Sequence, residues 1–345
     1  MRNMELTDRQ KEVLRAVVLQ HVRTAEPVAS RALARRFQMA VSPATVRNVM
    51  VDLEEAGLLE QPHTSAGRVP TDVGYRVFVD RLMVKEAPTR EEIVLLRTEL
   101  GHERRTVESF LKRTSRALGK AADQLGIAIS PGIRAGALAR IEASPLAGGR
   151  LLLGFAFVSG AVRTIHTRMD KDEAGASLSE AMSWVNRRID GLGLKDLSRF
   201  LEREIGSHML PADWRGVFGL LREAVEMLLG MEEGEQVHFG GAANIMAQPE
   251  FSDPEHLRPI VAMMEQSDLL VRSLAGAEEE GVRIIIGREN KWRPMRHCSL
   301  VVSTYQSGSV RGRIGVVGPI RMPYPRLVPL VERAAEIVSR SLESM

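Results

Sequence analysis

One short helix with clearly marked ends, residues 42–57, constrains the fold of this 345-residue chain more than any other feature. Ser42 is a favoured N-cap residue and Pro43 suits the first helical position, while Gly57 is typical of the position just after a helix. Four apolar residues recur at helical spacing and form a stripe that we expect to be buried: Val46, Val49, Met50 and Leu53. The opposite face of this helix is therefore free to meet solvent or a partner.

Similar signals on either side of this helix predict a small domain. Thr7-Asp8 opens a helix that runs to about Thr24, Ser30 caps a second short helix, and Thr71-Asp72 caps a fourth. Residues 58–70 form two short extended pieces around a polar tip, which indicates a β-hairpin. Three helices, a hairpin and a fourth helix predict a winged helix-turn-helix domain over residues 1–85.

The free face of the third helix has the side chains that a DNA-reading helix needs. Ala44 permits close approach to the groove floor, Asn48 can bond an adenine edge, and Arg47 can reach a guanine or a phosphate. Hydroxyl groups, an imidazole and an arginine at the hairpin suit contacts with phosphates. We expect ten residues to contact DNA: Arg31, Ser42, Ala44, Thr45, Arg47, Asn48, His63, Thr64, Ser65 and Arg68.

Charge supports this interpretation without deciding it. The whole chain has a formal net charge of +3, whereas residues 1–50 contain nine basic and four acidic side chains, a net of +5. A local basic excess favours binding to a phosphate backbone. The alternatives are a solvated basic surface, a winged helix that binds protein, and a structural adaptor without affinity for DNA.

The rest of the chain reads as an α+β domain with a helical insertion. Apolar residues recur every seven positions in the charged segment 86–126, which predicts a helical linker, either a seam between subunits or an amphipathic helix packed on its own domain. The second interpretation is favoured, because glycines interrupt the repeat. Strand patterns place residues 127–172 and 241–345 in one α+β domain, and residues 173–240 read as a mainly helical insertion.

Nothing in the sequence supports an enzyme or a cofactor. The eight histidines lack the paired spacing of metal ligands, and the single cysteine, Cys298, excludes an internal disulfide and a cysteine-based zinc site. The glycine-rich runs 240–244 and 308–312 match neither a P-loop nor a dinucleotide fingerprint. No apolar run is long enough for a membrane span, and we expect a cytoplasmic protein.

Four runs of sequence resemble a known family. They are Glu26–Arg31, the run SPATVRN at Ser42–Asn48, the run QPHTSAGRVPT at Gln61–Thr71, and GVVGPIRMPY at Gly315–Tyr324. The chain resembles the heat-inducible transcriptional repressors called HrcA over nearly its whole length. It departs from the family's pattern at Pro323, where an aspartate is expected before Tyr324.

This resemblance implies more than the residues do alone. It implies a repressor of chaperonin and chaperone operons that binds an inverted-repeat operator in double-stranded DNA as a homodimer. It also implies that the α+β parts form a GAF-like domain, that residues 173–240 form an inserted dimerisation domain, and that the chaperonin modulates activity by keeping the repressor folded. The resemblance further implies that the repressor leaves its operator when heat diverts the chaperonin.

An inverted repeat requires two-fold symmetry, so some subunit interface must exist. The apolar faces of the insertion are either its own core or part of that interface, and we choose them as the interface: Leu178, Met182, Val185, Phe218, Leu221 and Val225. The closest alternative function is a winged-helix regulator that senses a small molecule through its GAF-like domain. An enzyme that uses the winged helix only for targeting is a third possibility, against which the missing catalytic constellation argues.

Overall fold

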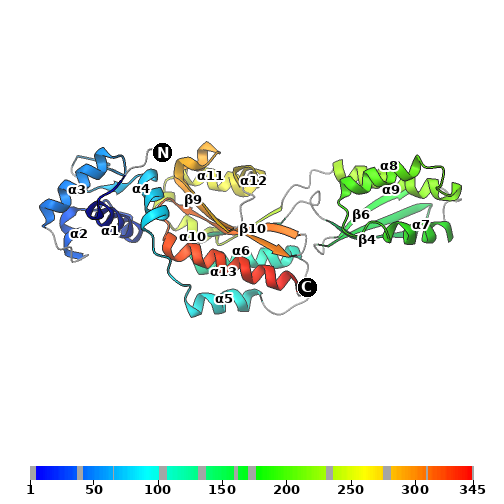
Figure 1. Ribbon diagram of the computed structural model, residues 1–345, viewed down its shortest axis with the longest axis horizontal. Coiled ribbons are helices and arrows are strands. Elements are labelled where there is room, and N and C mark those ends of the chain that lie inside the picture. The colour runs from blue at the N-terminus through cyan, green and yellow to red at the C-terminus, as the bar shows by residue number, and fades with distance from the viewer. Residues whose placement is uncertain are drawn as a thin grey trace.

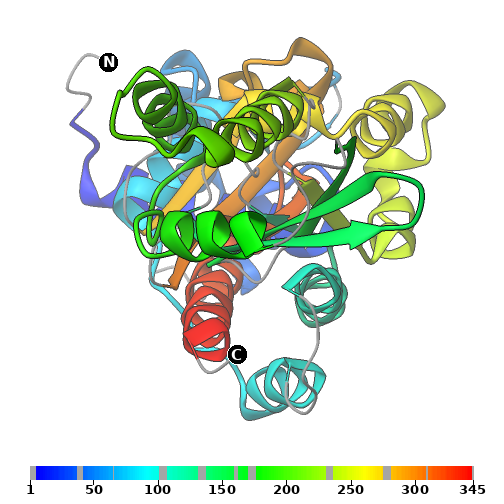
Figure 2. The same ribbon diagram turned by 90° about the vertical axis from the view of Figure 1, so that its right-hand side faces the viewer.

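The computed structural model describes residues 5–36, 42–64, 66–100, 107–130, 137–158, 162–169, 176–230, 236–274, 281–307 and 310–343. They form three parts in a row along the longest axis: a winged helix, a central body built on a five-stranded sheet, and a distal lobe comprising residues 137–230 (Figure 1). In the view turned by 90°, the distal lobe lies in front of the body, in agreement with this arrangement (Figure 2). The predicted α+β multidomain fold, with a winged helix at the N-terminus, is confirmed.

The winged helix has the order of elements that the sequence predicts. These are α1 (Asp8–Thr24), α2 (Ser30–Arg36), α3 (Pro43–Glu55), β1 (Leu59–Glu60), β2 (Val69–Pro70), α4 (Asp72–Val77) and the π-helical turn η1 (Phe78–Leu82). The side chains of Thr7, Ser42 and Thr71 each accept a backbone N–H in the first turn of the helix that follows. Gly57 has a φ of 72°, which lets the chain leave α3 and enter the antiparallel pair β1–β2.

The body is one antiparallel sheet with helices on both faces. Its strands run in the order β7 (Gln236–Gly240), β3 (Leu125–Ser130), β10 (Val310–Pro319), β9 (Cys298–Ser307) and β8 (Val282–Ile286). One face packs against α6 (Val107–Ala122) and α13 (Tyr324–Glu343), and α5 (Arg90–Leu100) packs on both of these helices. The other face packs against α11 (Pro254–Glu265) and α12 (Asp268–Leu274). Short elements complete the body: α10 (Ala242–Met246), η5 (Pro249–Phe251), η6 (Gly287–Glu289) and η7 (Arg293–His297).

The amphipathic alternative for residues 86–126 matches the position of α6. Phe110, Leu111 and Leu118 are buried against the body sheet of their own chain. Segment 86–126 was predicted as a linker between domains, and α6 belongs instead to the body core. Pro323, the departure from the family pattern, precedes α13, and its carbonyl accepts the Leu327 N–H at 3.0 Å.

The distal lobe has its own sheet and its own core. Its elements are β4 (Leu138–Leu146), β5 (Arg150–Phe157), β6 (Val162–Arg168), α7 (Ala176–Asn186), α8 (Leu194–Ile205), η4 (Ala212–Trp214) and α9 (Arg215–Gly230). The three strands pair only with one another among the described residues, and they share one hydrophobic cluster with the helices.

The predicted domain boundaries therefore need correction. Residues 138–168 were assigned to the GAF-like domain, but they belong to the lobe, while residues 236–240, assigned to the insertion, form the edge strand β7 of the body. Alternation of apolar and polar residues predicts a strand but carries no information about its pairing partner. Here β3 pairs with a strand that follows the whole lobe, with Ser130 opposite Gln236.

Candidate DNA-binding surface

Helix α3 presents the predicted face to solvent. Ser42, Ala44, Arg47 and Asn48 are exposed and Thr45 is half-buried, whereas the four residues of the apolar stripe are buried on the opposite side. Ser42 Oγ accepts the Thr45 N–H at 3.1 Å, which caps the helix. The side chain of Asn48 is therefore not covered by the protein's own core, which is the condition that a base-reading role requires.

The tip of the wing is exposed and held by one glutamine. His63 and Thr64 are exposed, and Ser65 lies outside the described residues. Gln61 Nε2 donates to the carbonyl oxygens of Thr64, at 3.1 Å, and Ala66, at 2.9 Å. These two bonds close the loop upon itself, so His63 and Thr64 project from a braced turn.

Arg68 lies at the base of the wing, where it is paired with a residue of α3. Its Nη2 and Nε lie 2.6 and 2.8 Å from Glu54 Oε2, and its side chain is only 13% exposed. The backbone of Arg68 also pairs with Val28, and a Cβ at Gly67 would stand 2.4 Å from the Val28 carbonyl oxygen. Arg68 therefore binds the wing to α3 and to the loop before α2, a role that sequence reasoning missed because Glu54 is fourteen positions away.

Arg31 is exposed on α2, and Arg35 and Arg36 at the end of the same helix are exposed too. These side chains extend a basic surface beside α3, the helix against which α2 packs. Such guanidinium groups suit phosphate oxygens of a DNA backbone.

The six residues predicted as a dimer interface lie in the core of the distal lobe. Leu178 and Met182 are 4% and 6% exposed, and Val185, Phe218, Leu221 and Val225 are fully buried within one chain. The prediction that these side chains meet a second subunit is wrong, because the lobe's own strands and helices cover them. Of the two interpretations of these apolar faces, the lobe's own core is the one that the structure supports.

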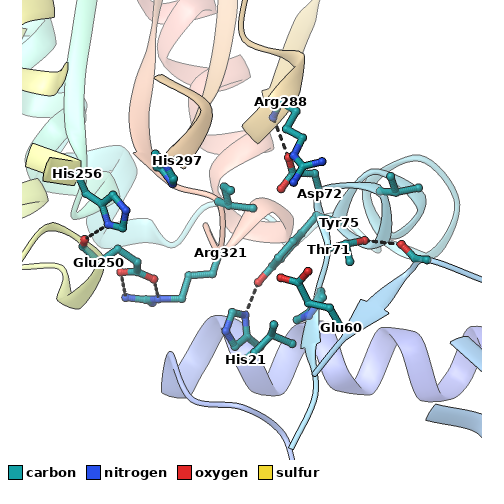
Figure 3. Close-up of a pocket in the computed structure, with 15 residues that line it drawn as sticks. His21, Glu60, Thr71, Asp72, Tyr75, Glu250, His256, Arg288, His297 and Arg321 are labelled. Carbon is teal, nitrogen blue, oxygen red and sulfur yellow. Dashed lines mark hydrogen bonds and ion pairs between the residues drawn. The ribbon is translucent and has the colours of Figure 1, made fainter. Parts of the chain in front are cut away.

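A second polar site lies where the winged helix meets the body. A cavity of about 460 Å³ is lined by α1, β1, β2 and α4 on one side and by η5, α11, η6, η7 and the loop after β10 on the other (Figure 3). His21 Nδ1 and the Tyr75 hydroxyl share a hydrogen bond of 2.6 Å on the winged-helix side. Burial lowers the pKa of His21 to about 4, with a further lowering by Arg321 that Glu250 opposes.

The other ionisable groups of the described residues bear on metal binding and on the state of the single cysteine. Among the described residues, no three side chains of His, Cys, Asp or Glu are grouped as a metal would require. Burial raises the pKa of the Cys298 thiol to about 12, so this cysteine stays protonated and unreactive. Within the described part of the chain, no helix combines the length and apolar character needed to cross a bilayer.

A capped helix with an exposed polar face, a braced wing and a basic second helix define a winged-helix DNA-binding protein. Two family models match the chain: the HrcA winged helix-turn-helix DNA-binding domain of transcription repressors over residues 5–82, and the HrcA C-terminal domain over residues 108–328. The heat-inducible transcription repressor HrcA of Moorella thermoacetica is 35% identical over 344 residues and that of Geobacter sulfurreducens 34% over 343. The alignments cover 98–99% of this chain and 99% of each relative. The chain belongs to the HrcA family of heat-inducible transcription repressors, which are not enzymes.

A solved structure agrees with the fold. A crystal structure of a hypothetical protein is similar to this chain with a TM-score of 0.60 at 23% identity, and the alignment covers 99% of both chains. At this identity the likeness bears on the fold alone. It extends over the winged helix, body and distal lobe together.

Proposed function

We propose that this repressor binds an inverted-repeat operator of heat-shock operons as a homodimer and that the chaperonin modulates its activity. The observation that carries the DNA-binding part is the exposed polar face of α3, with Asn48 and Arg47 free of the domain's core. Each α3 lies in a major groove and reads base edges, while His63 and Thr64 at the wing tip contact the flanking backbone. The half-sites then lie one or more helical turns apart, with about 34 Å per turn.

The dimer is formed through the distal lobe, at its surface rather than its core. Five of the ten exposed large hydrophobic side chains in the described part of the chain lie in this lobe: Leu146, Val158, Val162, Met209 and Met227. Met209 is the most exposed of them, at 90%. Assembly at the far end of the molecule leaves both winged helices free to reach DNA.

Dependence on the chaperonin is inferred from family membership. Activity that follows the folded fraction of the repressor links operator occupancy to the supply of free chaperonin. When unfolded proteins occupy the chaperonin, the folded fraction falls and the operons are transcribed.

The test is DNA footprinting on a chaperonin promoter with purified full-length protein, with and without chaperonin and ATP. We expect two protected half-sites in one inverted repeat, and stronger protection when chaperonin and ATP are present. Protection of a single half-site would contradict the dimer, and equal protection with and without chaperonin would contradict the modulation. A salt titration that leaves binding unchanged would contradict phosphate contacts altogether.

A further inference from the structure

The run GVVGPIRMPY at Gly315–Tyr324 forms the joint between the body and the winged helix. It comprises the end of β10, a short loop and the first residue of α13. Tyr324 at its end is fully buried, and its ring lies 6.1 Å from that of Tyr75 in α4. Arg321 in its loop reaches across to α1 (Figure 3).

Arg321 joins three partners from two domains. Its Nη1 donates to the Val22 carbonyl oxygen at 3.1 Å, and this oxygen belongs to the last turn of α1, where helical partners are missing. Its other nitrogens bind body residues: the Nε and Nη2 pair with the two oxygens of Glu250, and Nη2 donates to Gln248 Oε1 at 2.9 Å. The side chain is 12% exposed, so water competes little for these bonds.

Two further polar links cross the same junction. Arg76 of α4 pairs with Glu289 and donates to the Ile284 carbonyl oxygen at 2.8 Å. The Arg288 N–H of the body donates to Asp72 Oδ2 at 2.8 Å. Between these links and Arg321 lies the cavity of about 460 Å³. Beside the cavity one hydrophobic cluster continues from the winged helix into the body and includes Tyr75 and Tyr324, so the polar links set the geometry of the junction together with this packing.

We propose that Arg321 is a positioning residue that sets the orientation of the winged helix on the body and thereby the spacing of the two recognition helices in the repressor dimer. The proposal rests on the dimeric operator binding proposed above. A guanidinium held in two planar bonds by Glu250 has little rotational freedom, and its remaining nitrogen meets α1 in one direction only. A change of that orientation moves α3 relative to its copy without altering α3 itself.

A changed orientation of the winged helix should affect binding to DNA with two half-sites differently from binding to DNA with one. A single winged helix binds a half-site regardless of its orientation on the body. Binding of both half-sites by one dimer needs the correct separation, and the gain from two linked contacts is lost when geometry forbids simultaneous engagement. Loss of Arg321 should therefore weaken binding to the full operator and spare binding to a half-site.

The experiment compares Arg321→Gln, Arg321→Lys and wild type in full-length protein on operator DNA with two half-sites or one. We expect Arg321→Gln to weaken binding to the full operator by about tenfold or more and to change half-site binding by less than about twofold. Arg321→Lys, which keeps the charge, should restore part of the difference. The matched control is Arg326→Gln, because Arg326 binds Glu92 and the Ala121 carbonyl oxygen, both inside the body.

A measurement without DNA separates this proposal from the proposed function. Spin labels at the exposed positions Glu55 in α3 and Arg258 in α11, introduced through cysteines while Cys298 stays buried, report the distance between winged helix and body. Arg321→Gln should broaden the distance distribution, and Arg326→Gln should leave it unchanged. An unchanged distribution, or equal losses on full and half-site DNA, would overturn the positioning role. A broadened distribution in a protein that binds neither DNA would overturn the proposed function instead.

Discussion

The winged helix and the distal lobe contrast in what their sequence patterns reveal. In the winged helix, polar residues with known affinity for DNA stand on a face that α3 leaves exposed, whereas in the lobe the most regular apolar stripes are covered by the lobe itself. An exposed polar face is open to a partner. An apolar stripe at helical spacing serves a core and an interface equally well, so the same reasoning that located Asn48 misplaced Phe218.

The largest effect should come from the core of the lobe. Phe218→Ala removes a fully buried ring that packs near Trp184 and Trp214. We expect it to destabilise the lobe by about 3–5 kcal/mol, measured by denaturant unfolding. Met246→Ala, at a side chain 46% exposed in the body, is the control and should cost little stability. Dissociation of a dimer by Phe218→Ala with unchanged unfolding would restore the interface interpretation of this residue.

Acid should act next most strongly, and at the junction between winged helix and body. His21 has a folded-state pKa of about 4, below the ordinary 6.5, so it folds neutral and must gain a proton in acid. The contribution of neutral His21 to the free energy of unfolding is complete above pH 6.5 and is lost as the pH falls from 6.5 towards 4. The total loss is about 2–3 kcal/mol. Unfolding followed between pH 7 and 4.5 should show this loss in wild type, and His21→Gln should show less of it. Identical slopes would contradict the burial of a neutral His21.

Asn48→Ala tests the exposed face of α3. We expect a loss of about 1–3 kcal/mol at the base pair that Asn48 reads, with reduced discrimination among operator variants. Competition binding with substituted operators measures both. Gln266→Ala, at an exposed amide in the body, should change neither. Unaltered discrimination in Asn48→Ala would remove this residue from the interface.

The smallest effect tests whether Arg68 holds the wing against α3 or contacts a phosphate of the DNA. Arg68→Ala and Glu54→Ala should each weaken operator binding modestly, and the double variant should lose less than the sum, with a coupling of about 1 kcal/mol. The salt dependence should stay as in wild type, because the charge of Arg68 is already paired with that of Glu54. The control is Arg31→Ala, at an exposed side chain, which should lower the salt slope by about one. If Arg68→Ala also lowered the salt slope of binding, Arg68 would be a phosphate contact.

Local signals allowed much of the winged helix to be predicted. The caps at Thr7, Ser42 and Thr71, together with Gly57, mark the ends of α1, α3 and α4 because each depends on bonds between residues three or four apart. The same logic gave the exposed face of α3, because burial of one stripe determines where the remaining residues point.

What could not be predicted depends on residues far apart in the chain. The pairing of β3 with β7, the ion pair of Arg68 with Glu54, and the reach of Arg321 to α1 join segments that no periodicity connects. The run GVVGPIRMPY, which contains Arg321, resembles a family motif and so marked this segment. Its sequence does not indicate that Arg321 contacts α1. Surface and core within the distal lobe became distinguishable only when its sheet and helices were placed together.

The pairing of Ser130 with Gln236 makes β3 and β7 the two arms of a single hairpin in which an entire folded lobe takes the place of the turn. Joining two strands through an unstructured connection has an entropic cost that rises with its length, and a lobe that is itself folded shortens the unstructured part of this connection. Melting of the lobe would therefore loosen an edge of the body sheet as well as the lobe itself. An insertion placed in this way couples its own unfolding to the part of the molecule that supports the DNA-binding domain.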